Sequence, residues 1–154
     1  RKKTELNHTK PAFKNVGVST MSHSSKRLGR VLILENDYSN RVLFADYLEY
    51  CGYSVFPLAD EQKIFESLAE FQPEVLILNL KMPFIDGFSI IEQLRSHPRW
   101  QYLAVLVVTG YTLDRDRQRA YQLEANDYLT KQIIHNELST SVARLSLLWL
   151  AAFF

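Results

Sequence analysis

The residues of this chain that could do chemistry stand directly after short apolar runs. In chain order they supply an acid, an amide and a second acid, then a further amide, a hydroxyl and an amine: Glu35, Asn36, Asp37, Asn79, Thr109 and Lys131. Side chains of these types hold ions and ligands through charge and hydrogen bonds. They form a site only if the fold brings them together, so the elements that carry them come next.

Five short apolar runs alternate with stretches in which apolar residues recur every three or four positions. A short continuous apolar run indicates a buried strand, and the longer period indicates a helix. The predicted strands are 31–34, 53–58, 75–78, 103–108 and 127–130. The predicted helices are 39–50, 60–71, 88–97, 113–125 and 136 to about 150.

The first predicted helix illustrates the pattern. Val42, Leu43, Ala45, Leu48 and Tyr50 recur at mixed steps of three and four residues, and a glycine follows as a stop signal. These positions indicate an amphipathic helix.

Strands that are apolar throughout, without alternation, are typical of a parallel sheet covered by helices on both faces. Right-handed strand–helix–strand connections then favour an α/β fold with a doubly wound, five-stranded parallel sheet and five helices. In such sheets ligands collect at the carboxyl ends of the strands, where the polar residues named above stand.

Composition narrows the classes of protein. The chain has one cysteine, Cys51, and four scattered histidines, which excludes an intramolecular disulfide and disfavours a metal cluster. No apolar run reaches the ~18 residues that a membrane span needs. We therefore expect a cytoplasmic protein that binds no membrane.

Charge divides the chain unevenly. Residues 1–30 contain eight Lys or Arg and one acid, whereas residues 31–154 contain ten basic and sixteen acidic residues. We interpret 1–29 as a basic, flexible leader or linker, 30–150 as the folded domain and 151–154 as an apolar end. A basic tail can also bind nucleic acid or anionic lipid, but no motif accompanies the charge here.

Four segments in register resemble the receiver domain of bacterial two-component response regulators. They are VLILEN (31–36), PEVLILNLKMPFIDG (73–87), VVTG (107–110) and ANDYLTK (125–131). The resemblance runs from about residue 30 to the end of the last helix and implies the flavodoxin-like receiver fold.

The resemblance also implies a site. In this family an aspartate after the third strand accepts a phosphoryl group from a histidine kinase, and an acidic pair after the first strand helps to hold a divalent metal. By position, Glu35 matches the first acid of the pair, Lys131 the family's lysine, Thr109 its hydroxyl and Tyr128 its aromatic switch residue. The fold alone could also retain the last three, so both a structural role and a two-state switch stay open for them.

Two departures change the expected function. The second acid is replaced by Asn36 and the phosphoacceptor by Asn79. An amide nitrogen is a poor nucleophile, and an amide brings no charge to a cation site. The sequence therefore predicts a pseudo-receiver, not an enzyme, with no catalytic residue and no cofactor. Magnesium binding should be weak or absent, even with Asp37 next to the pair.

The apolar carboxyl end predicts a partner surface. Leu147 and Leu148 have no obvious core site on the last helix, so they would pack against a partner or a second copy, unless the helix continues. Expected partners are a histidine kinase, another receiver or a downstream effector domain.

Three alternatives remain. The chain could be a conventional phosphoaccepting response regulator whose acceptor position has been changed to Asn79. It could be a DNA-associated regulator acting through the basic leader, although no helix-turn-helix follows. An enzyme with its own substrate is the weakest alternative, because no nucleophile–base pair is visible.

Overall fold

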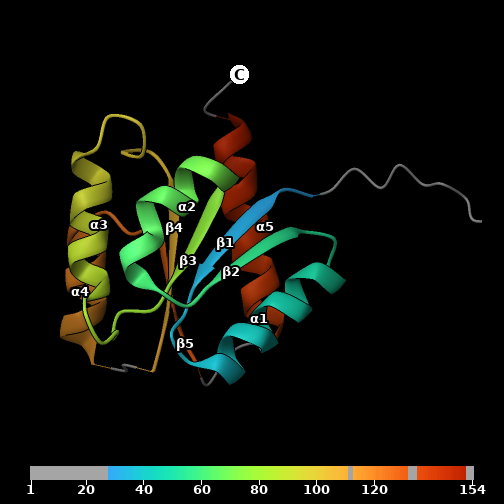
Figure 1. Ribbon diagram of the computed structural model, residues 1–154, viewed down its shortest axis with the longest axis horizontal. Helices are drawn as coiled ribbons and strands as arrows, with labels where there is room; N and C mark the ends of the chain where they lie inside the picture. Colours follow the sequence, from blue (N-terminus) through green and yellow to red (C-terminus); the bar gives the residue numbers. More distant parts are fainter. Residues whose placement is uncertain (1–27, 111–112, 132–134, 152–154) are drawn as a thin grey trace, which may run out of the picture.

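The computed structural model describes residues 28–110, 113–131 and 135–151, without the side chains of 135–136 and 148–151 (Figure 1). The strands are β1 (Arg30–Leu34), β2 (Ser54–Leu58), β3 (Val75–Leu78), β4 (Ala104–Thr109) and β5 (Asp127–Thr130). The helices are α1 (Tyr38–Tyr50), α2 (Ile64–Phe71), α3 (Gly87–Ser96), α4 (Asp114–Gln122) and α5 (His135–Ala151). Every predicted strand and helix is present, with bounds that mostly shift by one or two residues.

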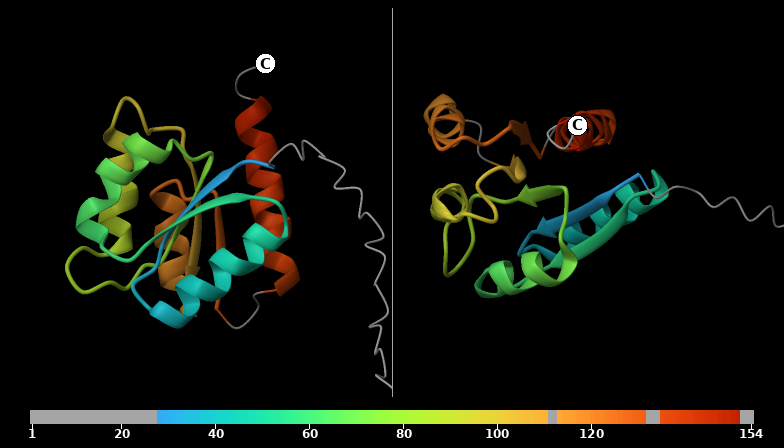
Figure 2. Two further views of the ribbon diagram at one scale, coloured as in Figure 1. Left: turned by 45° about the vertical axis from the view of Figure 1, so that its right-hand side comes forward. Right: turned by 90° about the horizontal axis from the view of Figure 1, so that it is seen from above.

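The five strands form one parallel sheet in the order β2-β1-β3-β4-β5. Helices cover both of its faces, as the views in Figures 1 and 2 show. α1 and α5 pack on one face, whereas α2, α3 and α4 pack on the other. This arrangement confirms the predicted doubly wound α/β fold.

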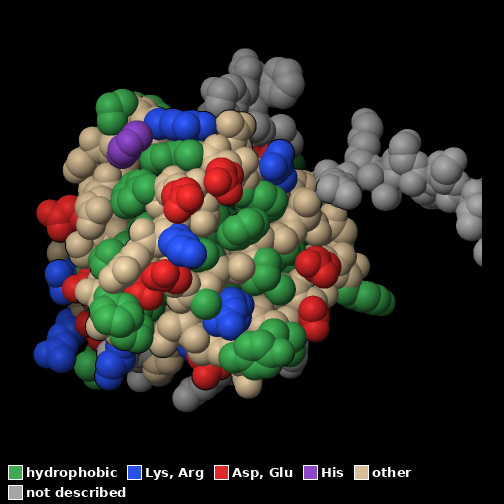
Figure 3. Space-filling model, in the orientation of Figure 1, with side chains coloured by type: hydrophobic (Ala, Val, Ile, Leu, Met, Phe, Trp, Pro, Cys, Tyr) green, Lys and Arg blue, Asp and Glu red, His purple; other side chains and the backbone are tan. Residues whose placement is uncertain are grey.

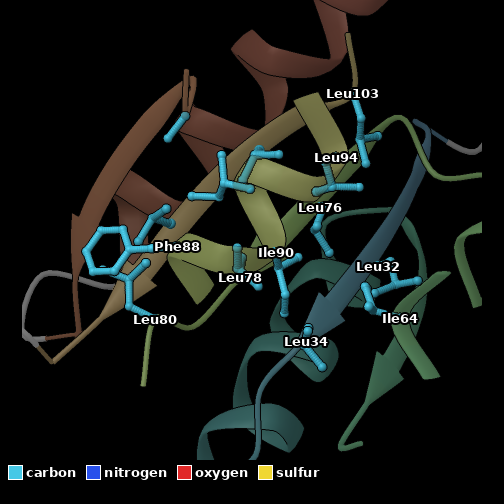
Figure 4. Close-up of a cluster of buried hydrophobic side chains, with 14 of the residues drawn as sticks. Leu32, Leu34, Ile64, Leu76, Leu78, Leu80, Phe88, Ile90, Leu94 and Leu103 are labelled. Carbon is cyan, nitrogen blue, oxygen red and sulfur yellow. The ribbon is translucent and has the colours of Figure 1, made fainter. Parts of the chain in front are cut away.

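Successive strand residues point alternately into two hydrophobic cores, one on each face of the sheet. Leu32 and Leu34 of β1 point toward α2 and α3, into the larger cluster shown in Figure 4. Val31 and Ile33 point to the opposite face, toward α1 and α5. Because both faces are covered, the strands show no polar alternation, and this is why the sequence carries continuous apolar runs.

Aspartates cap the N-termini of α1 and α3. The Asp37 side chain accepts a hydrogen bond from the Asn40 N–H, and the Asp86 side chain accepts one from Ser89. Asp60 caps a 3₁₀ turn, Glu61–Lys63, which precedes α2. The predicted single helix over 60–71 is therefore wrong in its first turn, because a cap at Asp60 followed by a tight turn delays the α-helix until Ile64.

The buried face of α1 matches only some of the apolar positions that indicated an amphipathic helix. Phe44, Ala45 and Leu48 form its buried face, while Val42, Leu43 and Tyr50 are exposed: Val42 by 37%, Leu43 by 46% and Tyr50 by 90%. Apolar residues occur on both sides of this helix, so spacing alone could not identify the side that faces the sheet.

α5 covers the sheet through Leu138, Val142 and Leu145, which are all buried. Leu147 is 66% exposed, whereas the side chain of Leu148 lies outside the described residues. Within the described part of the chain, no helix is long and apolar enough to cross a membrane.

Candidate functional site

The carboxyl ends of β1, β3, β4 and β5 meet at a polar hollow of about 390 Å³. Parallel pairing with Leu34 opposite Leu78 places the next residues of β1 and β3, Glu35 and Asn79, beside each other. The pairing of Thr109 with Thr130 places Lys131 directly after β5 at the same edge. The hollow is lined by Glu35, Asn36, Asp37, Asn40, Asn79, Lys81, Thr109, Gly110 and Lys131.

The buried charge of this site is the Glu35 carboxylate, which is only 2% exposed. The Lys131 ammonium lies 3.0 Å from one of its oxygens and donates to the other at 3.2 Å. The Asp37 N–H also donates to this carboxylate at 3.0 Å. Glu35 is therefore neutralised by a lysine of the same chain.

Asn79 is 6% exposed, and its amide nitrogen is surrounded by acceptors. Nδ2 lies 3.0 Å from Asn36 Oδ1, 3.3 Å from Glu35 Oε1 and 3.1 Å from the Lys81 carbonyl oxygen. Its two hydrogens are shared among these three oxygens. The amide thus links the ends of β1 and β3 to the loop after β3.

The two residues after Glu35, Asn36 and Asp37, make different hydrogen bonds. The Asn36 side chain accepts from Asn79, while the Asp37 carboxylate accepts from the Asn40 N–H at 2.8 Å and caps α1. Asp37 therefore lines the hollow with a carboxylate already committed to a helix N-terminus.

Thr109 and Tyr128, the predicted switch residues, are both buried. Tyr128 packs in the core beside α3 and α4, with the Arg117 guanidinium 5.8 Å from its ring centroid. Burial raises the pKa of Tyr128, Asp116 raises it further, and Arg117 lowers it. The Tyr128 ring thus lies inside the domain and does not line the polar hollow.

The donor set does not fit a magnesium site. Mg²⁺ binds through carboxylates and phosphates and keeps several waters. Here one carboxylate is paired with Lys131, another caps α1, and the two remaining positions are amides joined to each other. Among the described residues, no group of three or more His, Cys, Asp or Glu side chains could hold a metal.

The structure adds two residues that sequence reasoning missed. Arg41 donates to the Glu35 carbonyl at 2.9 Å and fixes the chain after β1. Glu61, which is 2% exposed, accepts from the Phe84 N–H at 2.7 Å and anchors the loop after β3. Glu61 and Phe84 are far apart in the sequence, and no local pattern signals that contact.

Comparisons with known proteins agree with this geometry. The sequence model of the response regulator receiver domain matches residues 31–143. Protein RcaC of Microchaete diplosiphon is 33% identical over 115 residues, which cover 75% of this chain and 18% of RcaC. The DNA-binding dual master transcriptional regulator RpaA of Synechocystis sp. is 31% identical over 116 residues, which cover 75% of this chain and 48% of RpaA. The chain thus spans less than half the length of either relative.

A solved structure is similar over the same region. The signal receiver domain of a signal transduction histidine kinase from Syntrophus aciditrophicus superposes with a TM-score of 0.70 at 25% identity. The match covers 77% of this chain and 89% of that domain.

Proposed function

The chain belongs to the response regulator receiver family, and from this premise we propose that it is a phosphorylation-independent receiver that acts by binding other proteins. As a receiver domain it is a module of two-component signalling. The finer proposal concerns how it signals: without accepting a phosphoryl group, without a metal and without an enzymatic reaction of its own. In this proposal it works in the cytoplasm.

The observation that carries the proposal is the hydrogen bonding of Asn79. The lone pair of its amide nitrogen is delocalised into the carbonyl, which makes the nitrogen a poor nucleophile. The same nitrogen donates hydrogen bonds to oxygens of Asn36, Glu35 and Lys81. A carboxylate oxygen in the place of this nitrogen would face Glu35 Oε1 and the Lys81 carbonyl oxygen, which can only accept hydrogen bonds. The oxygens around this position therefore suit an amide donor better than a carboxylate.

Asn36 argues against the alternative of a conventional receiver with one changed acceptor. A single blocking change at position 79 would leave an acid at position 36, whereas Asn36 supplies the neutral oxygen that Asn79 binds. The name of RpaA describes a DNA-binding protein, but the match covers only 48% of RpaA, so we do not propose DNA binding for this chain.

Partners are proposed at the level of the family: a histidine kinase, another receiver or an effector domain. The surface formed by α4, β5 and α5 carries exposed Leu147 and Tyr121, with an ion pair between Arg144 and Asp127. Apolar side chains rimmed by charge suit a protein contact.

The test is exposure of the full chain to acetyl phosphate, and separately to beryllofluoride, with magnesium. We expect no added mass and no amide shifts around Asn79. The matched control is the double variant Asn36→Asp with Asn79→Asp, which restores both carboxylates and should react. A stoichiometric phosphoryl adduct on the unaltered chain would overturn the proposal.

A further inference from the structure

α1 exposes more apolar surface than a solvated helix needs. Tyr38 is 70% exposed and Tyr50 is 90% exposed, and Val42 and Leu43 between them are exposed as well. Green side chains accordingly appear over α1 in the lower right of Figure 3, where Figure 1 places this helix. Scattered exposed apolar residues are ordinary, but four along one helix indicate a covered face.

The same face is acidic. Asp46 and Glu49 are exposed there. The only basic residue of α1, Arg41, is half-buried at its amino end, where it donates to the Glu35 carbonyl and its guanidinium lies 5.6 Å from the Tyr38 ring centroid. Two copies of this face would bring like charges together, which disfavours a symmetric dimer. The occupant that fits is an apolar segment carrying positive charge.

The described chain begins beside the carboxyl end of α1. The Leu28 N–H donates to the Gly52 carbonyl oxygen at 3.1 Å, two residues beyond the last residue of the helix. The residues before Leu28 therefore join the domain at one end of the exposed face.

Those residues have the required composition. Residues 1–27 contain seven Lys or Arg and one acid, and Phe13, Val16 and Val18 lie among them. An extended chain covers about 3.3 Å per residue and α1 rises about 1.5 Å per residue, so the link from Val18 to Leu28 can span the helix.

We propose that residues 1–27 bind back onto the exposed face of α1, with the apolar residues of 13–18 against Leu43 and Tyr50 and the lysines beside Asp46 and Glu49. The segment then covers this face in the isolated chain. An external partner of α1 would first have to displace it.

The test uses the full chain with one nitroxide label. Ser39→Cys with Cys51→Ser puts the label on the exposed face of α1, and Ser96→Cys with Cys51→Ser puts it on α3, on the other face of the sheet. Amide signals of residues 10–21 should lose intensity with the α1 label and keep it with the α3 label. The loss should not depend on protein concentration.

Two sets of variants, with added salt, test whether charge and apolar contacts hold residues 1–27 against α1. Asp46→Lys with Glu49→Lys should restore most of the lost intensity, as should ~1 M salt, at which the Debye length is about 3 Å. Leu43→Ser with Tyr50→Ser should also restore it, while far-UV circular dichroism remains unchanged. Equal intensities with the two labels would overturn the proposal, and a loss that grows with concentration would assign the face to a second copy instead.

Discussion

Asn79 and Asn36 form a matched pair at the scale of single residues. The Asn79 amide donates to Asn36 Oδ1, and the buried Glu35 carboxylate beside it is paired with Lys131. The site therefore needs no cation to balance its charge, unlike a cluster of three acids.

Restoring both carboxylates should reverse this balance. Without metal, Asn36→Asp with Asn79→Asp should lower the free energy of unfolding by about 1–3 kcal/mol, because acceptors then face acceptors around Glu35. Magnesium should return this stability, by about 2.7 kcal/mol at 100 times its Kd. Urea unfolding with and without ~10 mM magnesium measures both effects. The unaltered chain is the control, and a clear magnesium-dependent rise in its stability would contradict the prediction.

The raised pKa of Tyr128 leads us to expect a loss of stability at alkaline pH. Burial raises its pKa above the ordinary value of 10.0, so above that pH the unfolded chain loses the proton before the folded chain does. This contribution is complete below about pH 10 and falls as pH rises through the folded pKa. Tyr128→Phe should therefore flatten the decline of urea midpoints above about pH 10. Tyr102→Phe, at an exposed tyrosine, controls for loss of a hydroxyl, and an equal decline in all three proteins would contradict the assignment.

Arg95 joins elements rather than single residues. Its five N–H groups each have an acceptor: the carbonyl oxygen of Glu124 twice, those of Gln101 and Leu103, and Asn126 Oδ1. It thereby ties the last turn of α3 to the chain before β4 and to the turn before β5. Burial lowers the pKa of Arg95 and Glu124 raises it, and the guanidinium stays protonated.

Arg95→Lys should therefore be costly although it keeps the charge. A lysine has three donors on one nitrogen and cannot reach acceptors on both sides, so we expect a loss of about 2–3 kcal/mol in the free energy of unfolding. Arg115→Lys, at an exposed arginine of α4, should change it by less than ~0.5 kcal/mol. Chemical denaturation of the unaltered protein and the two variants measures these free energies of unfolding. Similar losses for both variants would refute the role of the Arg95 guanidinium.

At the scale of the whole molecule, exposed Leu147 of α5 marks a surface that is open to another protein. Leu147→Glu should weaken self-association or partner binding without unfolding the sheet, because the residue is 66% exposed. Sedimentation velocity over a concentration series, with far-UV spectra, measures this. Tyr102→Glu, an exposed aromatic residue before β4, is the control. A monomer at every concentration, with unchanged partner binding by the variant, would contradict the prediction.

Much of this molecule follows from the sequence alone. Continuous apolar runs such as 31–34 and 75–78 predict buried parallel strands, since only a sheet covered on both faces tolerates them. Parallel strands then bring Glu35, Asn79 and Lys131 to one edge, so the members of the site could be named before their geometry was known. The residue types at 36 and 79 also predict the loss of the acceptor.

Tertiary structure decided the rest. Only packing shows that Phe44 and Leu48, rather than Leu43 and Tyr50, face the sheet, because α1 is apolar on both sides. The links from Arg95 to Glu124 and from Glu61 to Phe84 join segments far apart in sequence. Such contacts depend on how the elements are placed in space, and local periodicity carries no record of that placement.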